Sequence, residues 1–408
     1  ILIYFDPSII ELLKLKIAFL TAGGIAPCLS ASIGALIERY AETAPGAQLF
    51  GYLNGYQGLL KGRIIEFPAN AGREANILYK YGGSPLGNSR VKLTNAEDCV
   101  RRGLVTEGDF PLEVAAKQLQ KDQVTILHTI GGDDTNTMAA ELARYLSENN
   151  YDLTVVGLPK TVDNDIVPIA QSLGAATAAE QGALFFENIA NENTTSTRQL
   201  IIHEVMGRHC GWLTAATARE YRKRLQDREF YPEMLISMDR WDVDAIYVPE
   251  LPIDLEAESV RLKRKMDEKD GVNIFLSEGA GIETIVNELE AKDEEVPRDA
   301  FGHVRLDEIN PGLWYAKQFS NRLKAQKVLV QKSGYFARSA AANARDLELI
   351  KRSATLAAEC GLSGQNGVVG LDEDNNDELS LINFDRIKGG KPFNTDQNWF
   401  QDMLKEIN

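Results

Sequence analysis

The sequence is poor in cysteine and has no paired cysteine motif. Its 408 residues contain only four cysteines, at the widely separated positions Cys28, Cys99, Cys210 and Cys360. Without a C-x-x-C pair, neither a structural zinc site nor a disulfide framework is indicated. We therefore expect four buried thiols in a protein of the reducing cytoplasm.

Long apolar runs and an excess of positive charge are both missing. The longest apolar runs have strand length, far below the ~18 residues that a membrane-spanning helix needs. The apolar opening at 1–16 is interrupted by Asp6, Pro7 and Glu11, and it lacks the features of a signal peptide. Lys and Arg number 44 against 59 Asp and Glu, a formal net charge of −15. We therefore expect no membrane partner and no nucleic-acid partner, since both attract basic proteins.

The sequence does contain a repeated succession of a short apolar run, a glycine-containing turn and a helical stretch. The predicted strands lie at 16–20, 123–130, 153–158, 199–205, 272–277 and 327–331. Continuous apolar runs without alternation favour strands that are covered on both faces. Strands that alternate with helices predict an α/β fold with mostly parallel sheets. The length predicts two domains of about 200 residues each.

The turn GGDDT follows the second predicted strand. Ligands of parallel sheets bind at the carboxyl ends of the strands, so residues directly after a strand are informative. Gly131 and Gly132 can point backbone N–H groups at a phosphate near a helix start. Asp133 is a candidate ligand for Mg²⁺. The alternative is an ordinary turn in which an aspartate caps the helix.

The turn PKTVDND follows the next strand and places two carboxylates beside a lysine. Asp163 and Asp165 are two residues apart, and Lys160 lies close by in the sequence. A carboxylate that accepts a hydroxyl proton and a lysine that neutralises a phosphoryl group would explain this combination. The alternative is a surface turn with a local Lys–Asp pair.

Three more segments carry charge after a strand or in a flexible loop. Arg208 in MGRHCG can bind phosphate with two parallel hydrogen bonds. Glu278 in SEGAG can accept hydrogen bonds from sugar hydroxyls, and Tyr335 and Arg338 follow in GYFARS. Arg90 ends a glycine-rich loop. The structural alternatives are a surface arginine for Arg208, a helix cap for Glu278, and packing for Tyr335 and Arg338.

Other charged or titratable residues are expected to have structural roles. The basic run at 221–229 is typical of a solvated helix end, with the wall of an anion site as the alternative. The acidic segments at 288–299 and 372–378 are typical of exposed loops. The histidines show no metal-ligand spacing: His128, His203, His209 and His303.

Taken together, these turns combine cations, carboxylates and glycine loops, which is the set that phosphoryl transfer requires. No Ser–His–Asp set and no G-x-G-x-x-G motif competes with this interpretation. The sequence therefore predicts phosphoryl transfer from a phosphate donor to a sugar-like alcohol.

In this order, GGDDT, PKTVDND, MGRHCG, SEGAG and GYFARS resemble the motifs of the 6-phosphofructokinase family, from about residue 16 to about residue 370. Two positions resemble its pyrophosphate-dependent branch, because Asp134 and Lys160 stand where the ATP-using enzymes have glycine. A carboxylate at 134 adds bulk and negative charge where the α-phosphate of a nucleotide would lie. A lysine at 160 adds a positive charge that can hold the orthophosphate leaving group.

The resemblance implies two Rossmann-like, doubly wound domains with the active site in the cleft between them. The phosphoryl-donor domain would comprise 1–170 and about 335–408, and the sugar-phosphate domain 171–334. The resemblance further implies Mg²⁺ as cofactor and a homodimer or homotetramer. Arg198 is a candidate for reaching into a neighbouring subunit's site.

The implied reaction is the reversible transfer of a phosphoryl group from pyrophosphate to the 1-hydroxyl of D-fructose 6-phosphate, in glycolysis and gluconeogenesis. The alternatives are an ATP-dependent 6-phosphofructokinase and a non-catalytic regulatory subunit of the same fold that binds sugar phosphate.

The resemblance also assigns a role to each motif residue. Asp163 would be the general base, with Asp165, Lys160 and Arg208 as further catalytic residues and Asp133 as the metal ligand. The donor-binding residues would be Gly24, Arg90, Gly131, Gly132, Asp134, Lys160 and Thr161. The residues binding fructose 6-phosphate would be Thr161, Asp163, Met206, Gly207, Arg208, Glu278, Tyr335 and Arg338.

Overall fold

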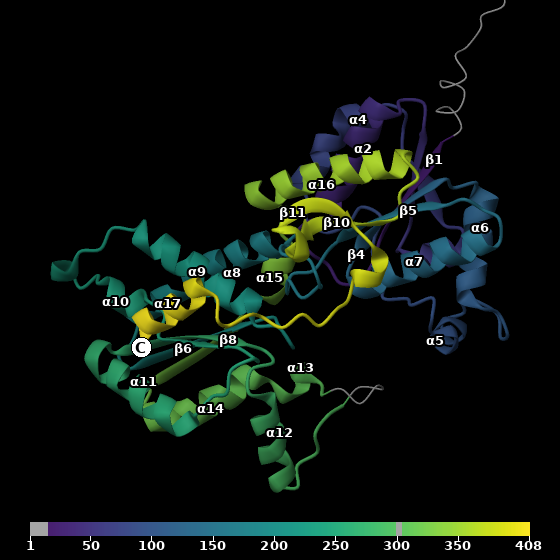
Figure 1. Cartoon of the computed structure of the whole chain (residues 1–408). Coiled ribbons are helices and arrows are strands. Elements are labelled where there is room, and N and C mark those ends of the chain that lie inside the picture. The colour runs from purple at the N-terminus through teal and green to yellow at the C-terminus, as the bar shows by residue number, and fades with distance from the viewer. Residues whose placement is uncertain (1–14, 299–303) are drawn as a thin grey trace, which may run out of the picture. The chain divides into compact units, whose positions relative to one another are not determined.

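The computed structural model describes residues 15–298 and 304–408. The expectations for the segment 1–14 and for His303 therefore lie outside the described residues. The chain divides into two compact units, Ile1–Thr177 with Arg338–Lys391, and Ala178–Ala337 with Pro392–Asn408. We expected residues 335–408 to belong to the first domain, but Pro392–Asn408 belongs to the second unit. The reason is that α17 (Asn398–Ile407) packs against a strand of that unit. Figure 1 labels the elements of both units.

The described part of the first unit contains a seven-stranded sheet in the order β11-β10-β5-β4-β1-β2-β3. Its strands are β1 (Lys16–Thr21), β2 (Gln48–Tyr52), β3 (Ile64–Glu66), β4 (Ile126–Gly131), β5 (Thr154–Pro159), β10 (Gly367–Asp372) and β11 (Glu378–Ile382). Only β3 and β11, at the two edges, pair antiparallel with their neighbours. The mostly parallel sheet is confirmed. The sequence pattern missed β2, β3, β10 and β11, which are short or interrupted by glycine.

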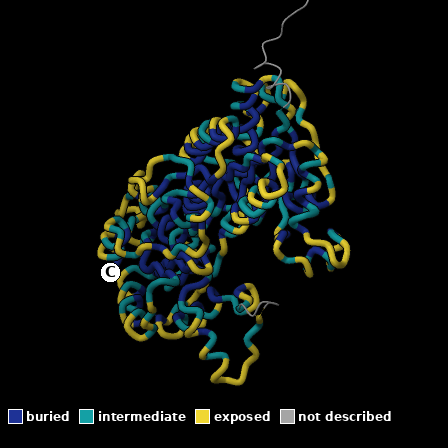
Figure 2. The backbone as a smooth tube through the Cα atoms, turned by 45° about the vertical axis from the view of Figure 1, so that its right-hand side comes forward, coloured by how far each residue is buried: buried dark blue, intermediate teal, exposed yellow. Residues whose placement is uncertain are grey.

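Helices cover both faces of this sheet, as the apolar strand runs predict. Ala18 and Leu20 of β1 belong to a core shared with α3, α6 and α7. Phe19, between them, points to the other face and packs near Tyr40 of α2. The helices are α2 (Leu29–Thr43), α3 (Tyr56–Lys61), α4 (Ala71–Glu74), α5 (Ala96–Arg101), α6 (Pro111–Asp122), α7 (Asp133–Glu148) and α16 (Ala344–Leu362). Figure 2 shows buried residues in dark blue running through the interior and exposed residues at turns and loops.

The second unit has a smaller, four-stranded sheet in the order β7-β8-β6-β9 among its described residues, and every pairing is parallel. Its strands are β6 (Gln199–Val205), β7 (Ala245–Tyr247), β8 (Gly271–Ser277) and β9 (Lys327–Lys332). Its helices are α8 (Ala175–Ile189), α9 (Trp212–Gln226), α10 (Met238–Trp241), α11 (Leu255–Lys269), α12 (Ile282–Ala291), α13 (Leu306–Ile309), α14 (Pro311–Leu323), α15 (Gly334–Arg338) and α17. Parts of α8 and α15 are counted with the first unit.

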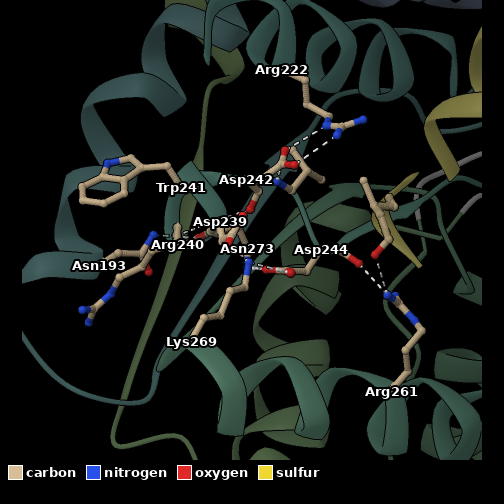
Figure 3. A network of polar contacts seen from close by, with 12 residues as sticks. Asn193, Arg222, Asp239, Arg240, Trp241, Asp242, Asp244, Arg261, Lys269 and Asn273 are labelled. Carbon is tan, nitrogen blue, oxygen red and sulfur yellow. Dashed lines mark hydrogen bonds and ion pairs between the residues drawn. The ribbon is translucent and has the colours of Figure 1, made fainter. Parts of the chain in front are cut away.

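A network of polar contacts supports the second sheet near the beginning of β8 (Figure 3). Buried Asp244 receives a hydrogen bond from the Asn273 backbone N–H at 2.9 Å and lies 2.8 Å from the Lys269 ammonium. Burial raises the pKa of the Asp244 carboxyl, and Lys269 acts against that shift. The side-chain amide of Asn273 donates to the carbonyl of Asp242, whose carboxylate binds Arg222. The network thereby joins α9, α11 and β8.

The basic run at 221–229 is part of this framework. Arg222 pairs with Asp242 and with Glu406 of α17, and Arg224 pairs with Glu187 of α8. These two arginines therefore serve helix packing, while Lys223, Gln226, Asp227 and Glu229 of the same run are exposed, as expected of a solvated helix end.

The cysteines and two of the histidines are buried in the core. All four cysteines are buried thiols, as expected. The Nε2 atom of His128 forms a hydrogen bond of 2.6 Å with the Tyr40 hydroxyl, and the His203 ring stacks on Phe186. Burial lowers the pKa of His128 to about 4 and that of His203 to about 3, so both are neutral core residues. Residues 373–378 are exposed, as expected, whereas Asp372 is buried against Arg386 at the end of β10.

No helix in the described ranges is long and apolar enough to cross a bilayer.

Candidate active site

Three of the predicted turns follow three neighbouring strands of the first unit. β5, β4 and β1 are adjacent in the sheet, and Gly131 at the end of β4 lies opposite Pro159 at the end of β5. Thr21, at the end of β1, lies opposite Ile130. Because all three strands are parallel, the turns after Thr21, Gly131 and Pro159 meet at one edge of the sheet.

A pocket of about 260 Å³ opens at this edge, which is near the lower end of the ~300–1,000 Å³ typical of small-molecule sites. The predicted residues in its lining are Gly24, Arg90, Gly132, Asp133, Asp134, Lys160, Thr161 and Asp165. Residues that the sequence interpretation did not assign to the site also line it: Ser89, Val91, Lys92 and Met138. The structure thus brings together most of the predicted donor-site residues.

The Gly131–Gly132 turn is braced from below by Asn136. The side-chain amide of Asn136 donates to the carbonyls of Gly131 and Gly132 at 3.1 and 3.0 Å. A Cβ atom at Gly131 would lie 2.4 Å from the Thr135 hydroxyl oxygen, so only glycine fits there. The two glycines lead directly into α7, whose N-terminal end favours an anion.

Asp133 is the first residue of α7, and Gly132 is the capping residue. The alternative of an aspartate N-cap is therefore wrong, since no side chain caps this helix. Burial raises the pKa of the Asp133 carboxyl, and the nearby carboxylates of Asp134 and Asp165 act in the same direction. A cation placed here would relieve this accumulation of negative charge.

The residues present fit a magnesium site in which the protein supplies only one or two carboxylates. The described residues contain no group of three or more His, Cys, Asp or Glu side chains arranged to hold a metal. Mg²⁺ often binds through only one or two carboxylates and completes its shell with phosphate and water oxygens. Asp133 in the pocket lining supplies one such carboxylate.

Asp134 lies on the rim of the pocket and pairs with Lys92. Its Oδ2 atom is 2.6 Å from the Lys92 ammonium, and both side chains are about half exposed. Lys92 lies in an extended segment in which Val91 and Leu93 are buried, while Arg90 and Lys92 are exposed. This period of two places Arg90 and Lys92 on the same side of the segment.

Lys160 is buried, so the alternative of a surface turn is wrong. Its backbone N–H donates to the Gly131 carbonyl at 2.8 Å, and its ammonium donates to the Gly24 carbonyl at 2.9 Å. Burial lowers the pKa of Lys160 to about 8, and the Arg338 and Arg90 guanidinium groups act in the same direction. The site thus holds a concentration of positive charge.

Arg338 lies at the Gly24 turn in this structure. Its Nε atom donates to the Ile25 carbonyl at 2.9 Å. A Cβ atom at Gly24 would come within 2.0 Å of the Arg338 guanidinium, so the guanidinium lies directly against the backbone of this turn. The family resemblance assigned Arg338 to fructose 6-phosphate, whereas the structure places it beside the turn predicted for the donor.

The PKTVDND turn holds its two carboxylates through hydrogen bonds. The Thr161 hydroxyl donates to Asp165 Oδ1 at 2.9 Å and accepts from the Asp163 N–H at 3.1 Å. Burial alternates along the turn, so that Thr161, Asp163 and Asp165 lie on its more accessible side. Asp165 lines the pocket, and the carboxylate of Asp163 is close enough to act on the pKa of Lys160.

Asn164, between the two aspartates, anchors this turn. It adopts a left-handed backbone conformation with φ +57° and is buried. Its Oδ1 atom accepts from the N–H and the hydroxyl of Ser172 at 2.7 and 3.0 Å, and its amide donates to the Ala170 carbonyl at 3.0 Å. Asn tolerates this conformation better than most residues, so the anchor suits the backbone.

In the second unit, the predicted turns follow β6, β8 and β9, which are also neighbours in their sheet. The Ser277 hydroxyl donates to the Gly207 carbonyl, and the Glu278 N–H donates to the Val205 carbonyl at 2.9 Å. Gly207 has φ +133°, and a Cβ atom there would lie 2.4 Å from the Cys210 carbonyl oxygen. The turns after β6 and β8 therefore pack tightly on each other.

The side chains on these turns differ in exposure. Burial raises the pKa of Glu278, while the Gly207 backbone hydrogen bond and Arg208 lower it. Arg208 is exposed, Met206 is half-buried, and the Tyr335 side chain after β9 is 74% exposed.

Arg198 does not extend away from its own unit. Its guanidinium donates to the carbonyls of Leu323 and Lys324 at the end of α14 and pairs with Asp267. It therefore satisfies a helix C-terminus, which contradicts the suggestion that it reaches a neighbour's site.

The site residues that the sequence did not reveal include side chains whose type alone does not indicate a ligand-binding role. Asn136, Asn164 and Ser172 act through backbone contacts that no motif reveals. Lys92 had a detectable signal, because Val91 and Leu93 alternate with two cations in one short segment.

A family model described as phosphofructokinase matches residues 16–360. This chain belongs to the phosphofructokinase family.

Individual phosphofructokinase relatives carry more detail. The chain is 59% identical over 392 residues to a pyrophosphate–fructose 6-phosphate 1-phosphotransferase of Methylomonas methanica, with 96% of each chain covered. It is 57% identical over 392 residues to a protein of the same description from Propionibacterium freudenreichii subsp. shermanii, with 96% and 97% covered. An ATP-dependent 6-phosphofructokinase of Borreliella burgdorferi is 26% identical over 376 residues, with 89% and 73% covered.

Solved phosphofructokinases also share the fold. A pyrophosphate-dependent phosphofructokinase from Marinobacter aquaeolei matches with a TM-score of 0.68 and 20% identity, over 96% of this chain and 92% of that chain. The expected phosphofructokinase-like α/β fold is thereby confirmed.

We predict that Asn164→Ala lowers the free energy of unfolding by about 1–3 kcal/mol, because it leaves the buried Ser172 N–H without its acceptor. Chemical denaturation measures the loss. Asn150→Ala is the matched control, since Asn150 has φ +60° but is exposed. Equal losses in the two variants would mean that backbone conformation alone, and not the buried hydrogen bonds, explains the effect.

Proposed function

We propose that this phosphofructokinase transfers a phosphoryl group from pyrophosphate to the 1-hydroxyl of D-fructose 6-phosphate, reversibly, giving fructose 1,6-bisphosphate and orthophosphate. The observation that carries the proposal is that Asp134 and Lys160 both line the small pocket at the carboxyl edge of the first sheet. The relatives that are 57–59% identical carry this activity in their names.

The pocket suits an inorganic diphosphate as the donor. Lys160, Arg90 and Arg338 surround the Gly23–Gly24 turn with positive charge. Asp134, held by Lys92, occupies the rim next to the start of α7. A nucleotide would bring its α-phosphate and ribose against this carboxylate, whereas a diphosphate ends before it.

The acceptor side of the reaction falls to the PKTVDND turn. Asp163 accepts the proton of the sugar 1-hydroxyl as that oxygen attacks the transferring phosphorus. Asp165, through its hydrogen bond from Thr161, orients the turn that carries Asp163. The Lys160 ammonium and the backbone of the Gly131–Gly132 turn stabilise the orthophosphate that leaves.

Asp133 would hold the magnesium ion of this family. When bound, the ion neutralises charge on the phosphate oxygens of the donor. The raised pKa of the Asp133 carboxyl in the unliganded chain reflects burial near two other carboxylates.

We assign the sugar phosphate to the second unit's turns after β6, β8 and β9. Arg208 would bind the 6-phosphate, and Glu278 would accept hydrogen bonds from the sugar hydroxyls. Met206, Gly207 and Tyr335 would shape the same site. The first unit would accordingly be the donor domain and the second the sugar-phosphate domain.

Two features bear on assembly and location. β9 is an edge strand whose residues are more exposed than those of β6 and β8 beside it. Phe336 and Tyr335, which follow β9, are large exposed aromatic residues. We infer that this edge is covered by a second copy in a homodimer or homotetramer. Four buried cysteine thiols support a reducing compartment such as the cytoplasm.

The alternatives are weaker on specific grounds. An ATP-dependent enzyme would need the rim that Asp134 and Lys92 occupy. A regulatory subunit that only binds sugar phosphate has no need for Asp163 and Asp165 held together by a hydrogen-bonded turn, with the Asp133 carboxylate near Asp165.

Asp163→Asn should lower kcat by at least about 10²-fold, because a placed general base contributes about 10²–10⁴-fold. The KM for fructose 6-phosphate should stay within several-fold. Steady-state kinetics with pyrophosphate measures both constants. Asp152→Asn is the matched control, since this exposed aspartate precedes the same strand. A near-wild-type kcat for Asp163→Asn would refute the assignment of the base.

Asp134→Gly combined with Lys160→Gly should reduce kcat/KM for pyrophosphate by at least about 10²-fold and permit measurable turnover with ATP. The two substitutions open the rim and remove the charge that suits orthophosphate. Parallel assays of both donors on the wild type and the double variant test this. The donor assignment fails if the wild type already prefers ATP.

The pKa of Lys160 gives a pH dependence with a definite sign. The ammonium is charged below about pH 8 and loses its charge as the pH rises through that value. We therefore expect kcat/KM for pyrophosphate to fall on the alkaline side with a midpoint near pH 8. Lys160→Arg keeps its charge there and should lose this step. An identical alkaline limb in both proteins would assign the titration to another group.

A further inference from the structure

A short segment near the end of the first unit lies across the turn that carries the paired carboxylates. We call residues 387–391 the strap. Lys388 and Val167 exchange two backbone hydrogen bonds, at 2.7 and 3.1 Å. The Lys391 N–H donates to the Asp165 carbonyl at 2.9 Å. The strap therefore runs antiparallel to residues 165–167.

Both ends of the strap are anchored. Ile387 is buried in a small apolar cluster with Ile166 and Ile169. At the other end, the Lys391 ammonium donates to the Ile169 carbonyl and pairs with Glu373 at 2.9 Å. The Lys391 side chain is only 17% exposed. The middle of the strap is thus held in place from both sides.

Gly389, in that middle, lies directly against the carboxylate of Asp133. A Cβ atom built on Gly389 would come within 2.0 Å of Asp133 Oδ2 and 2.6 Å of its Cγ. Real Cβ atoms do not approach this closely, and the backbone of Gly389 is not in the left-handed region. A side chain at 389 would therefore displace the Asp133 carboxylate, for reasons of space and not of backbone conformation.

We propose that Gly389 is a positioning residue for Asp133: the strap supports the carboxylate from one side and keeps it directed into the pocket, and only glycine leaves room for it. This inference rests on the proposed function, in which Asp133 holds the metal ion. Asp133 itself lies at the first position of α7, where the helix fixes its backbone. The strap supplies the contact that limits where its side chain can go.

The first measurement is metal affinity, with Mn²⁺ as the probe and methylenediphosphonate as a non-hydrolysable diphosphate. Electron paramagnetic resonance reports free Mn²⁺ in such a titration. We expect Gly389→Ala to weaken Mn²⁺ binding at least tenfold and to lower kcat, while the KM for fructose 6-phosphate stays within twofold. Lys388→Ala is the matched control, because its exposed side chain is a neighbour on the same strap. It should bind Mn²⁺ as the wild type does.

The second measurement separates a specific clash from general damage. Gly389→Ala should lower the unfolding midpoint in the wild-type background. In an Asp133→Ala background the same change should have little effect, because the atoms that the new Cβ would meet are gone. Mn²⁺ affinity within twofold of wild type for Gly389→Ala, or equal destabilisation in the two backgrounds, would overturn the proposal.

The same experiments distinguish this proposal from the proposed function. A wild-type protein that binds Mn²⁺ with the diphosphonate but does not phosphorylate fructose 6-phosphate would refute the reaction and leave Gly389 to be judged by binding. A wild-type protein that binds no Mn²⁺ under these conditions would overturn the role of Gly389 as well.

Discussion

Lys160 is the residue on which the candidate site depends. Its backbone joins the turn after β5 to the turn after β4, and its ammonium joins both to the turn after β1. Burying a cation without a full counter-charge costs several kcal/mol, and Arg90 and Arg338 nearby add to that cost. This arrangement lies at a pocket lined by glycine-containing turns, and we propose that an anionic ligand supplies the missing negative charge there.

The site also gathers carboxylates, whose negative charges oppose one another. Asp133, Asp134 and Asp165 lie near one another, and burial raises the pKa of Asp133. Lys92 pairs with Asp134 at the rim, so that carboxylate is balanced before any ligand arrives. Asp133, by contrast, is the carboxylate that lies against the strap. Charge and packing thereby support the proposal that Asp133 holds the metal ion.

The sequence was informative where chemistry and periodicity coincide. β1, β4 and β5 are apolar runs followed by glycine or charge, and the parallel sheet then forces their turns together. β10 and β11 were missed because glycines interrupt one and polar residues the other. β10 pairs with β5, and β11 in turn pairs with β10, so both depend on sheet pairing for their conformation. The expected end of the first domain also differed, since α17 returns to the second sheet through contacts that lie far apart in the sequence.

Within the site, the residue types that bind ligands were predictable and those that hold them were not. Lys160, Asp133 and Arg90 are recognisable by charge after a strand or loop. Asn164, Asn136 and Gly389 act through hydrogen bonds or empty space, which only the folded chain reveals. The contact of the Arg338 guanidinium with the Gly24 turn likewise joins residues far apart in the sequence, and the motif alone did not predict it.

We propose that this pocket binds an inorganic diphosphate in preference to a nucleotide. Calorimetric titration of the wild-type protein with magnesium pyrophosphate and, separately, with magnesium ATP measures this preference. We expect pyrophosphate to bind at least about a hundredfold more tightly, a difference of about 2.8 kcal/mol. ATP binding as tight as that of pyrophosphate would contradict it.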